Sequence, residues 1–321
     1  MTYSLKKTLK LILPIAIGVF LVLYWYHKTS PADREDILFY IKEADLFWVT
    51  LSLLLGIIGH VSRAIRWNYL LEPLGYKPKL TNNIFMIFMA YLANLGVPRT
   101  GEILRATALT TYEGVPFEKG FGTIVTERVV DVFMLLVVVV ITLLLQTDII
   151  ISFFEQRGFD LNGILLLLAA GLIAVLIFFI FVKKSNSSIA LKIKHFIKGL
   201  MDGVFSIFKM KRKWAFVFHT LLIWVCYIGM MWVIKFTVPE TASLSLNEIM
   251  VAFVFGAFAM ATTNGGVGLF PILVSKALVL FGISSVSGDA FGWIMWIAQT
   301  LMNVVFGAIS FLLLPLLNRY K

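Results

Sequence analysis

The sequence predicts an all-α membrane protein: a polytopic helix bundle with about six full spans and two broken or re-entrant helical hairpins in an inverted-topology arrangement. Three observations lead to this prediction. Of the 321 residues, 60% are hydrophobic and 14% are charged, whereas a soluble domain carries about 25% charged residues. Apolar runs of membrane-spanning length recur along the chain, and lysines and arginines collect between alternate runs. We therefore expect a single integral membrane domain over residues 1–321.

Six uninterrupted apolar runs have about the 20-residue length that a membrane helix needs. The first run follows Lys6, Lys7 and Lys10, as in a signal peptide, but no small-residue cleavage site comes after it. An uncleaved first helix is therefore expected. The predicted spans are 8–27, 46–66, 118–146, 162–182, 214–235 and 289–317.

The distribution of basic residues orients these spans. Lysine and arginine dominate the N-terminus, the segment 63–79, the loop 183–213 and the C-terminus, whereas the segments 147–161 and 236–247 hold one and none. The basic segments should face the cytoplasm, so we expect a protein of the bacterial inner membrane with both termini inside. The formal net charge of +10 follows from these loops and does not indicate a nucleic-acid partner.

Two further apolar regions are interrupted. Region 80–112 is cut at Gly96–Gly101, and region 247–282 is cut at Asn264–Gly268. In the orientation above, the first enters and leaves on the cytoplasmic side and the second on the outer side, each as a re-entrant hairpin or as a pair of spans. This plan is typical of inverted-repeat transporters. It comprises a first half 46–146, a second half 214–317, and between them a linker helix and basic cytoplasmic loop over 162–213.

The stretch from Asn94 to Arg105 combines a helix break with charge. Arg99, Glu102 and Arg105 are spaced by three, which on a helix puts them on neighbouring faces. A helix beginning near Arg99 would also direct its backbone N–H groups at an anion. The alternative is an interfacial loop in which the arginines and the glutamate only pair with each other. The residues expected to break the helix are Gly96, Pro98 and Gly101.

Two weaker groups of charged residues flank this stretch. Glu127, Arg128 and Asp131 lie within one helical turn at the start of span 118–146. They fit a substrate site and a self-neutralising structural network equally well. Arg63 and Arg66, at the inner end of the second span, are either snorkelling anchors or ligands for an anionic headgroup.

The second break carries no charge. Its residues allow backbone amides to approach a ligand closely or helices to pack tightly; they are Asn264, Gly265, Gly266 and Gly268. The chain has no Walker A motif, no paired metal-binding motif and no nucleophile elbow. We therefore expect no cofactor, no metal and no catalytic residue.

Three motifs resemble those of the lysylphosphatidylglycerol synthase membrane-region family. They are the stretch Asn94–Arg105, the motif Glu127-Arg-Val-Val-Asp131 and the motif Asn264-Gly-Gly-Val-Gly268, and the resemblance covers about residues 10–315. It implies a flippase-like membrane module. In the bifunctional relatives this module moves aminoacylated phospholipid between leaflets, and a separate soluble domain makes the lipid. That domain is missing here, so synthase activity is not carried over.

The chain departs from the family pattern at the second break. Relatives often have an acid shortly after the late glycines, where this chain has Phe270 and Pro271, and often have proline where Asn264 stands. The motif at this hairpin therefore contains no carboxylate, which puts in doubt any role that needs one there.

Together these observations predict a flippase or transporter that moves a phospholipid or lipid-linked headgroup between leaflets. Arginines would bind phosphate by bidentate hydrogen bonds, and the carboxylates would orient them or bind an amine headgroup. The alternatives are an integral membrane enzyme acting on a lipid headgroup and a membrane partner of a separate synthase or glycosyltransferase. Expected partners are anionic or zwitterionic lipids, a second copy of the chain or a lipid-modifying enzyme. The expected substrate site comprises Asn94, Arg99, Glu102, Arg105, Glu127, Arg128, Asp131, Arg63 and Arg66.

Overall fold

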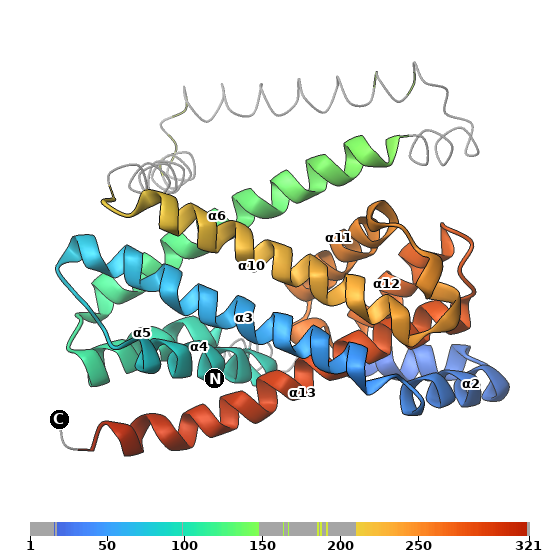
Figure 1. Cartoon of the computed structure of the whole chain (residues 1–321), viewed down its shortest axis with the longest axis horizontal. Coiled ribbons are helices and arrows are strands. Elements are labelled where there is room, and N and C mark those ends of the chain that lie inside the picture. The colour runs from blue at the N-terminus through green and yellow to red at the C-terminus, as the bar shows by residue number, and fades with distance from the viewer. Residues whose placement is uncertain are drawn as a thin grey trace. The chain divides into compact units, whose positions relative to one another are not determined.

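The computed structural model describes residues 18–97, 99–147 and 210–319, together with isolated positions between them and at residue 16. This described part is helical and contains no strand (Figure 1). The all-α prediction is confirmed for these residues.

Four helices are long and apolar enough to cross a membrane, and they coincide with four of the six predicted spans. These segments are Leu46–Leu74, Phe117–Leu145, Lys213–Thr237 and Ser285–Leu317. They correspond to α3 (Leu46–Leu71) with η1 (Glu72–Leu74), α6 (Phe117–Leu145), α10 (Lys213–Ile234) with η2 (Lys235–Thr237), and α13 (Ser285–Leu317). Of predicted span 8–27, residues 18–27 are described and are helical, while predicted span 162–182 lies outside the described residues apart from two isolated positions.

Side-chain caps start several helices where the sequence turns from polar to apolar. Ser30 caps α2 (Pro31–Lys42) by accepting from the Asp33 amide, and Asp45 caps α3 by accepting from the Phe47 amide. Such caps satisfy backbone donors that have no partner within the helix. The cap at Asp45 marks the start of α3, so α2 and α3 are two separate helices.

The first interrupted region forms two helices, as predicted. Helix α4 (Leu80–Gly96) ends and α5 (Thr100–Glu113) begins on either side of the expected break, and the two helices pack together. They contain 17 and 14 residues, so each is shorter than the four long apolar helices. Pro98 lies outside the described residues.

The second interrupted region is also broken where predicted. It consists of α11 (Leu246–Thr262), the short turn η4 (Asn264–Gly266) and α12 (Leu269–Val279), with η3 (Pro239–Ser243) before α11. Gly265, Gly266 and Gly268 have φ of 57°, 74° and 70°. Glycine adopts this left-handed region without the steric cost that a side chain brings, so these residues make the sharp reversal.

Contacts divide the chain into two compact units. Unit 1 comprises residues 1–125 and 212–321, and unit 2 comprises residues 126–211, so the division falls within α6. In unit 1, α10 packs along α3 (Figure 1), α4 packs against α3, α5 and α13, and α12 packs against α11 and α13.

The tips of the two hairpins meet inside unit 1. A Cβ added at Gly265 would lie 2.6 Å from Cδ2 of Leu95, which is next to the last residue of α4. From α13, Nε1 of Trp296 donates to the Gly265 carbonyl at 2.8 Å. The second break is therefore packed between the end of α4 and the face of α13.

We predict that Gly101→Ala loosens the first hairpin. The added Cβ would lie 2.2 Å from the Ala90 carbonyl oxygen, a backbone atom that moves only if α4 moves away from α5. The thermal unfolding midpoint in detergent should fall, by an equivalent of about 1–3 kcal/mol. Gly96→Ala is the matched control, because a Cβ there meets no atom within 4 Å. Equal losses in both variants would contradict this account of the hairpin.

We also predict a pH-dependent contribution from Glu240, in the connection between α10 and α11. Its carboxylate accepts from the Ser284 amide at 2.8 Å and from the Ser284 hydroxyl at 2.5 Å, at the start of α13. Hydrogen bonds from the Ser284 and Ser287 side chains lower the pKa of Glu240 below its usual 4.5. The stabilisation is therefore complete above about pH 5 and is lost as pH falls through the lowered value.

Comparison of the wild type with Glu240→Ala tests this contribution. The difference in thermal midpoint should be present at about pH 7 and should shrink as the pH falls below the usual pKa of a glutamate. Because the side chain is largely exposed, the effect should stay below about 1 kcal/mol. A difference that does not change with pH would show that the ionised carboxylate is not responsible.

Candidate functional site

Three arginines are buried in the described structure. Arg63 and Arg66 on α3 are 3% and 0% exposed, and Arg105 on α5 is 3% exposed. A snorkelling arginine keeps its guanidinium in water, which does not match these values. Buried arginines in an apolar helix usually face the interior of a bundle and mark a functional pathway.

Arg105 is held against the ring of Trp67. Its guanidinium carbon lies 3.7 Å from the Trp67 ring centroid, and Nε1 of Trp67 donates to the Thr123 hydroxyl at 2.9 Å. Thr123 in turn donates to the Gly120 carbonyl at 2.7 Å. A desolvated cation–π contact of this kind contributes about 2 kcal/mol. This chain of contacts joins α5, α3 and the first turns of α6 within unit 1.

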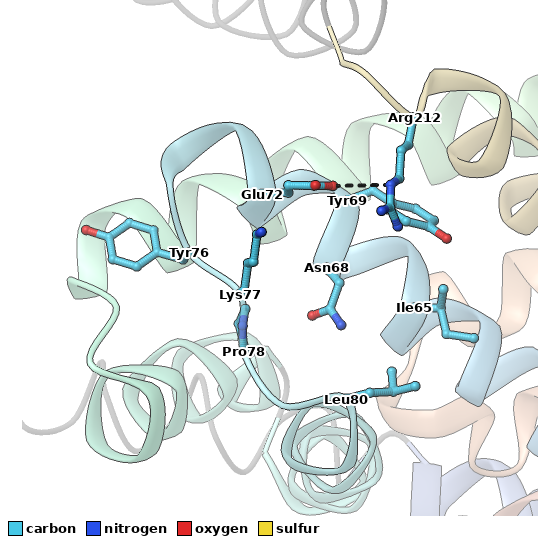
Figure 2. A pocket seen from close by; sticks show the side chains of 9 residues that line it. All are labelled: Ile65, Asn68, Tyr69, Glu72, Tyr76, Lys77, Pro78, Leu80 and Arg212. Carbon is cyan, nitrogen blue, oxygen red and sulfur yellow. Dashed lines mark ion pairs between the residues drawn. The ribbon is translucent and has the colours of Figure 1, made fainter.

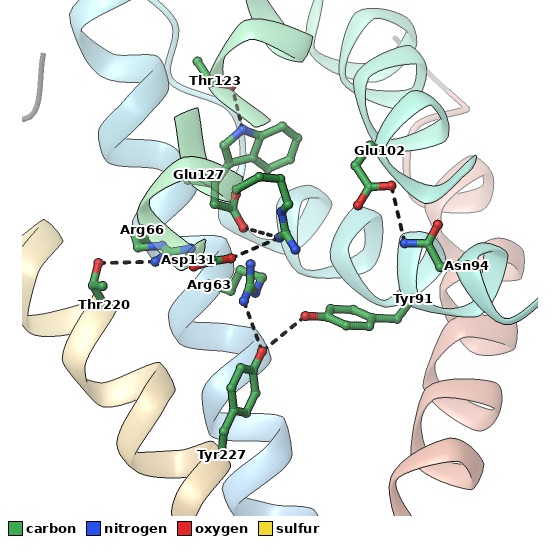
Figure 3. Close-up of polar contacts among 12 residues, drawn as sticks. Arg63, Arg66, Tyr91, Asn94, Glu102, Thr123, Glu127, Asp131, Thr220 and Tyr227 are labelled. Atoms are coloured by element: carbon green, nitrogen blue, oxygen red, sulfur yellow. Dashed lines mark hydrogen bonds and ion pairs between the residues drawn. The ribbon is translucent and has the colours of Figure 1, made fainter. Parts of the chain in front are cut away.

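The α3 arginines are also tied to neighbouring helices. Arg63 donates to the Tyr227 hydroxyl of α10 at 3.2 Å, and the Tyr91 hydroxyl of α4 lies 3.2 Å from the same oxygen (Figure 3). Arg66 donates to the Thr220 hydroxyl at 3.3 Å. Both acceptors are neutral hydroxyls, so these two bonds fix the positions of the guanidinium groups relative to α10.

The predicted face shared by Arg99, Glu102 and Arg105 is not formed. Arg99 precedes α5 and adopts the left-handed conformation, with φ of 61°, so helical spacing does not apply to it. Its side chain is exposed, whereas that of Arg105 is buried. Within the described residues, Arg99 and Glu102 take part in no ion pair.

Asn94 closes the tip of the first hairpin. Its side-chain oxygen accepts from the Gly101 amide at 2.8 Å, and its Nδ2 lies 3.5 Å from a Glu102 oxygen. The Thr100 amide bonds to the Val97 carbonyl. The first two amides of α5, which were expected to face an anion, therefore already have acceptors in the protein.

Glu127, Arg128 and Asp131, which belong to unit 2, form a network within one turn of α6. Nη2 of Arg128 lies 3.0 Å from a Glu127 oxygen and 3.5 Å from an Asp131 oxygen. The Glu127 side chain is fully buried, whereas that of Arg128 is 41% exposed. The spacing predicted this clustering. Ionising a buried carboxylate is costly unless it is compensated, and Arg128 supplies one compensating charge.

At the second break, the glycines allow chain segments to approach closely. A Cβ at Gly268 would lie 2.9 Å from the Gly18 carbonyl oxygen, and one at Gly266 would lie 2.6 Å from the Met260 sulfur. Asn264 is 6% exposed, and its Nδ2 has no acceptor among the described residues. Close packing therefore accounts for the glycines, while the Asn264 amide remains a donor in the interior.

Asp289 of α13 was not among the site residues predicted from the sequence. It accepts from Nε1 of Trp25 at 2.6 Å, and the rings of Trp25 and Trp293 lie edge to face at 5.2 Å. Gly288 packs on Ser275 of α12, so α13 carries this acid next to the second hairpin. The available signal was an aspartate at the first position of the predicted apolar span 289–317. It places a carboxylate near the hairpin whose own motif has none.

Among the described residues, no three His, Cys, Asp or Glu side chains form a group that would hold a metal ion. The polar side chains described above carry guanidinium, carboxylate, amide and hydroxyl groups. These groups recognise charged headgroups through hydrogen bonds and ion pairs.

Comparison with known proteins gives one family and three relatives. The family model of the lysylphosphatidylglycerol synthase transmembrane region matches residues 11–307. A UPF0104 membrane protein of Methanocaldococcus jannaschii is 24% identical over 221 residues, which cover 59% of this chain and 63% of that protein. Another, from Methanothermobacter thermautotrophicus, is 27% identical over 121 residues, covering 37% and 33%.

The third relative is the glycosyltransferase AglD of Haloferax volcanii. It is 27% identical over 104 residues, which cover 32% of this chain and 17% of AglD. The matches span less than two thirds of the length of each of the three relatives. No solved structure matches the chain.

The family match includes both helix breaks, the buried arginines and the charged turn of α6. Its membrane character agrees with the long apolar helices of the described structure. The chain belongs to the family of the lysylphosphatidylglycerol synthase transmembrane region.

Proposed function

We propose that this protein moves a phospholipid or lipid-linked headgroup between the leaflets of the membrane. The observation that carries the proposal is the meeting of the two broken hairpins at Leu95 and Gly265, in the same unit as three buried arginines. Membrane transporters place substrate sites where discontinuous helices meet near the middle of the bilayer. A channel for neutral solutes would not need buried guanidinium groups.

The arginines support an anionic phosphate as the group that is recognised. A guanidinium forms bidentate, charge-assisted hydrogen bonds with phosphate oxygens. Arg63 and Arg66 are positioned by neutral hydroxyls and Arg105 by the face of Trp67. In our proposal these three residues receive the headgroup phosphate in the interior of the bundle.

Arg99 would contact the headgroup at the protein surface, before the headgroup reaches the three buried arginines. It is exposed at the hairpin tip and has no partner among the described residues. A non-glycine residue in the left-handed region costs about 1–2 kcal/mol, and such strain persists mainly at functional sites. In our proposal this exposed arginine makes the first contact with an anionic headgroup.

The carboxylates of α6 would contribute to headgroup recognition. Glu127 is buried next to Arg128, which supplies one compensating charge. The Glu127 carboxylate would bind an amine headgroup directly. In this proposal the protein lies in a bacterial inner membrane, and both termini and the basic loops are on its cytoplasmic side.

A second candidate function rests on the similarity to AglD. That relative is named a glycosyltransferase, which suggests a membrane partner that presents a lipid-linked headgroup to a separate transferase. An integral membrane enzyme is a third candidate. Product formation in detergent, where no second leaflet compartment exists, would support the enzyme and contradict transport as the sole activity.

We predict that Arg105→Gln reduces lipid movement. Loss of a charge-assisted contact to phosphate costs about 1.5–3 kcal/mol, so the rate should fall about tenfold or more. The measurement is the loss of fluorescence of headgroup-labelled lipid in reconstituted vesicles after an impermeant quencher is added. Arg105→Lys should retain part of the activity, because the charge stays but the planar fork is lost.

Arg34→Gln is the control for this prediction. Arg34 is a partly exposed arginine of α2 that lies over the Tyr26 ring, remote in sequence from both hairpins, and its replacement should leave the rate unchanged. If Arg105→Gln folds normally and moves lipid as fast as Arg34→Gln does, the interior phosphate site is wrong.

We predict opposite effects on stability and activity for Arg99→Gly. Glycine removes the left-handed strain at φ of 61°, so the unfolding free energy should rise or stay equal, with a gain of up to about 1 kcal/mol. The same change removes the exposed guanidinium, so lipid movement in the vesicle assay should slow. A stabilised variant with unchanged transport would limit Arg99 to a structural role.

A further inference from the structure

A separate pocket lies where α3 turns into α4. It has a volume of about 320 Å³ and is formed by the last turns of α3, the following loop, the start of α4 and Arg212 before α10 (Figure 2). All of these residues belong to unit 1. None of them is among the residues assigned above to lipid movement.

Positive charge dominates the rim of this pocket. Lys77 is exposed and has no partner among the described residues. Arg212 lies 3.9 Å from Glu72, and both side chains are partly exposed, at 64% and 33%. An exposed ion pair at this distance contributes little, so Glu72 holds Arg212 near the pocket without fully neutralising the two cations.

Neutral hydrogen-bonding groups line the wall between these charges. Asn68 accepts from Asn83 through Oδ1, which fixes its orientation and leaves its Nδ2 without an acceptor among the described residues. The Tyr76 hydroxyl lies 3.5 Å from Nζ of Lys119, so a further cation stands beside the rim. The pocket thus presents an oriented amide donor and two cations to one space, while the Tyr76 hydroxyl points outward (Figure 2).

The location of the pocket fits a ligand that is part polar and part apolar. The apolar segment Leu46–Leu74 ends here and the segment Lys213–Thr237 begins here, so the pocket lies at the level where two membrane helices reach the polar boundary. Tyr69 and Tyr76 lie at this level, as tyrosines do in interfacial belts. Ile65 and Leu80 complete the lining with apolar surface.

We propose that this pocket binds the phosphate group of an anionic glycerophospholipid at the membrane surface. Lys77 and Arg212 would contact the phosphate oxygens, the Asn68 amide would donate to the phosphate or to the glycerol hydroxyl groups, and Ile65 and Leu80 would contact the upper acyl chain. Basic clusters next to membrane helices attract anionic lipid at about 1 kcal/mol for each cation. The site does not depend on lipid movement through the hairpins.

Lipid retention measured by native mass spectrometry tests the site. The full chain in detergent is titrated with phosphatidylglycerol and, separately, with diacylglycerol, which lacks the phosphate. We expect phosphatidylglycerol to bind more tightly, and Lys77→Gln to weaken its binding about fivefold. Lys79→Gln is the matched control, because this lysine is also exposed, lies two residues away and does not line the pocket. It should change the affinity less than twofold.

A second experiment on the same protein asks whether the pocket also binds free phosphate. Inorganic phosphate is added as a competitor at millimolar concentration. If inorganic phosphate displaces phosphatidylglycerol from the wild type but not from Lys77→Gln, the pocket recognises the phosphate group itself. If phosphatidylglycerol binds and inorganic phosphate does not displace it, the pocket is specific for the lipid. Equal effects of Lys77→Gln and Lys79→Gln, or equal binding of diacylglycerol and phosphatidylglycerol, would overturn the proposal.

The result is separable from the proposed transport. Both lysine variants should remain folded, because neither side chain has a partner among the described residues, and their thermal midpoints verify this. Arg105→Gln should leave the affinity of the pocket unchanged even where it abolishes lipid movement. Loss of phosphatidylglycerol binding in Arg105→Gln but not in Lys77→Gln would place the lipid in the interior site and contradict the pocket.

Discussion

The need to satisfy broken backbone inside an apolar bundle governs this structure. Free amides and carbonyls have no water to bond with in the membrane, so a helix break survives only where protein groups replace the missing partners. Asn94 provides the acceptor for Gly101, and Trp296 provides the donor for Gly265. Each break is closed by a side chain from a helix that packs beside it. The hairpins, their tips and the packing of α4 and α13 are consequences of these bonds.

Buried positive charge is the second constraint, and it explains the polar residues of α10 and α4. An apolar environment makes an isolated guanidinium very costly. Tyr227 and Thr220 each accept a hydrogen bond from one of the α3 arginines, and the Trp67 ring lies against Arg105. These contacts lower the cost of burying the guanidinium groups.

The sequence was informative where a single segment determines the outcome. The spans 46–66, 118–146, 214–235 and 289–317, both helix breaks and the cluster around Arg128 follow from hydropathy and local spacing. Sequence spacing failed at Arg99, because the helix begins one residue later and the backbone enters the left-handed region. The contact of Leu95 with Gly265, the stacking of Arg105 on Trp67 and the bond between Trp25 and Asp289 join segments distant in sequence. No local pattern predicts such pairs, because they depend on how helices pack in three dimensions.

Helix α3 links the two sites proposed here. Arg63 and Arg66 lie in its buried part, and Asn68, Tyr69 and Glu72 line the pocket at its end. At 1.5 Å per residue, Arg66 and Glu72 are separated along the helix axis by roughly 9 Å, which is comparable to the size of a phospholipid headgroup. The two proposed sites are therefore close to each other along one helix. A charge–charge contact becomes stronger as water is excluded, so the buried arginines would bind a phosphate more tightly than the exposed pocket does.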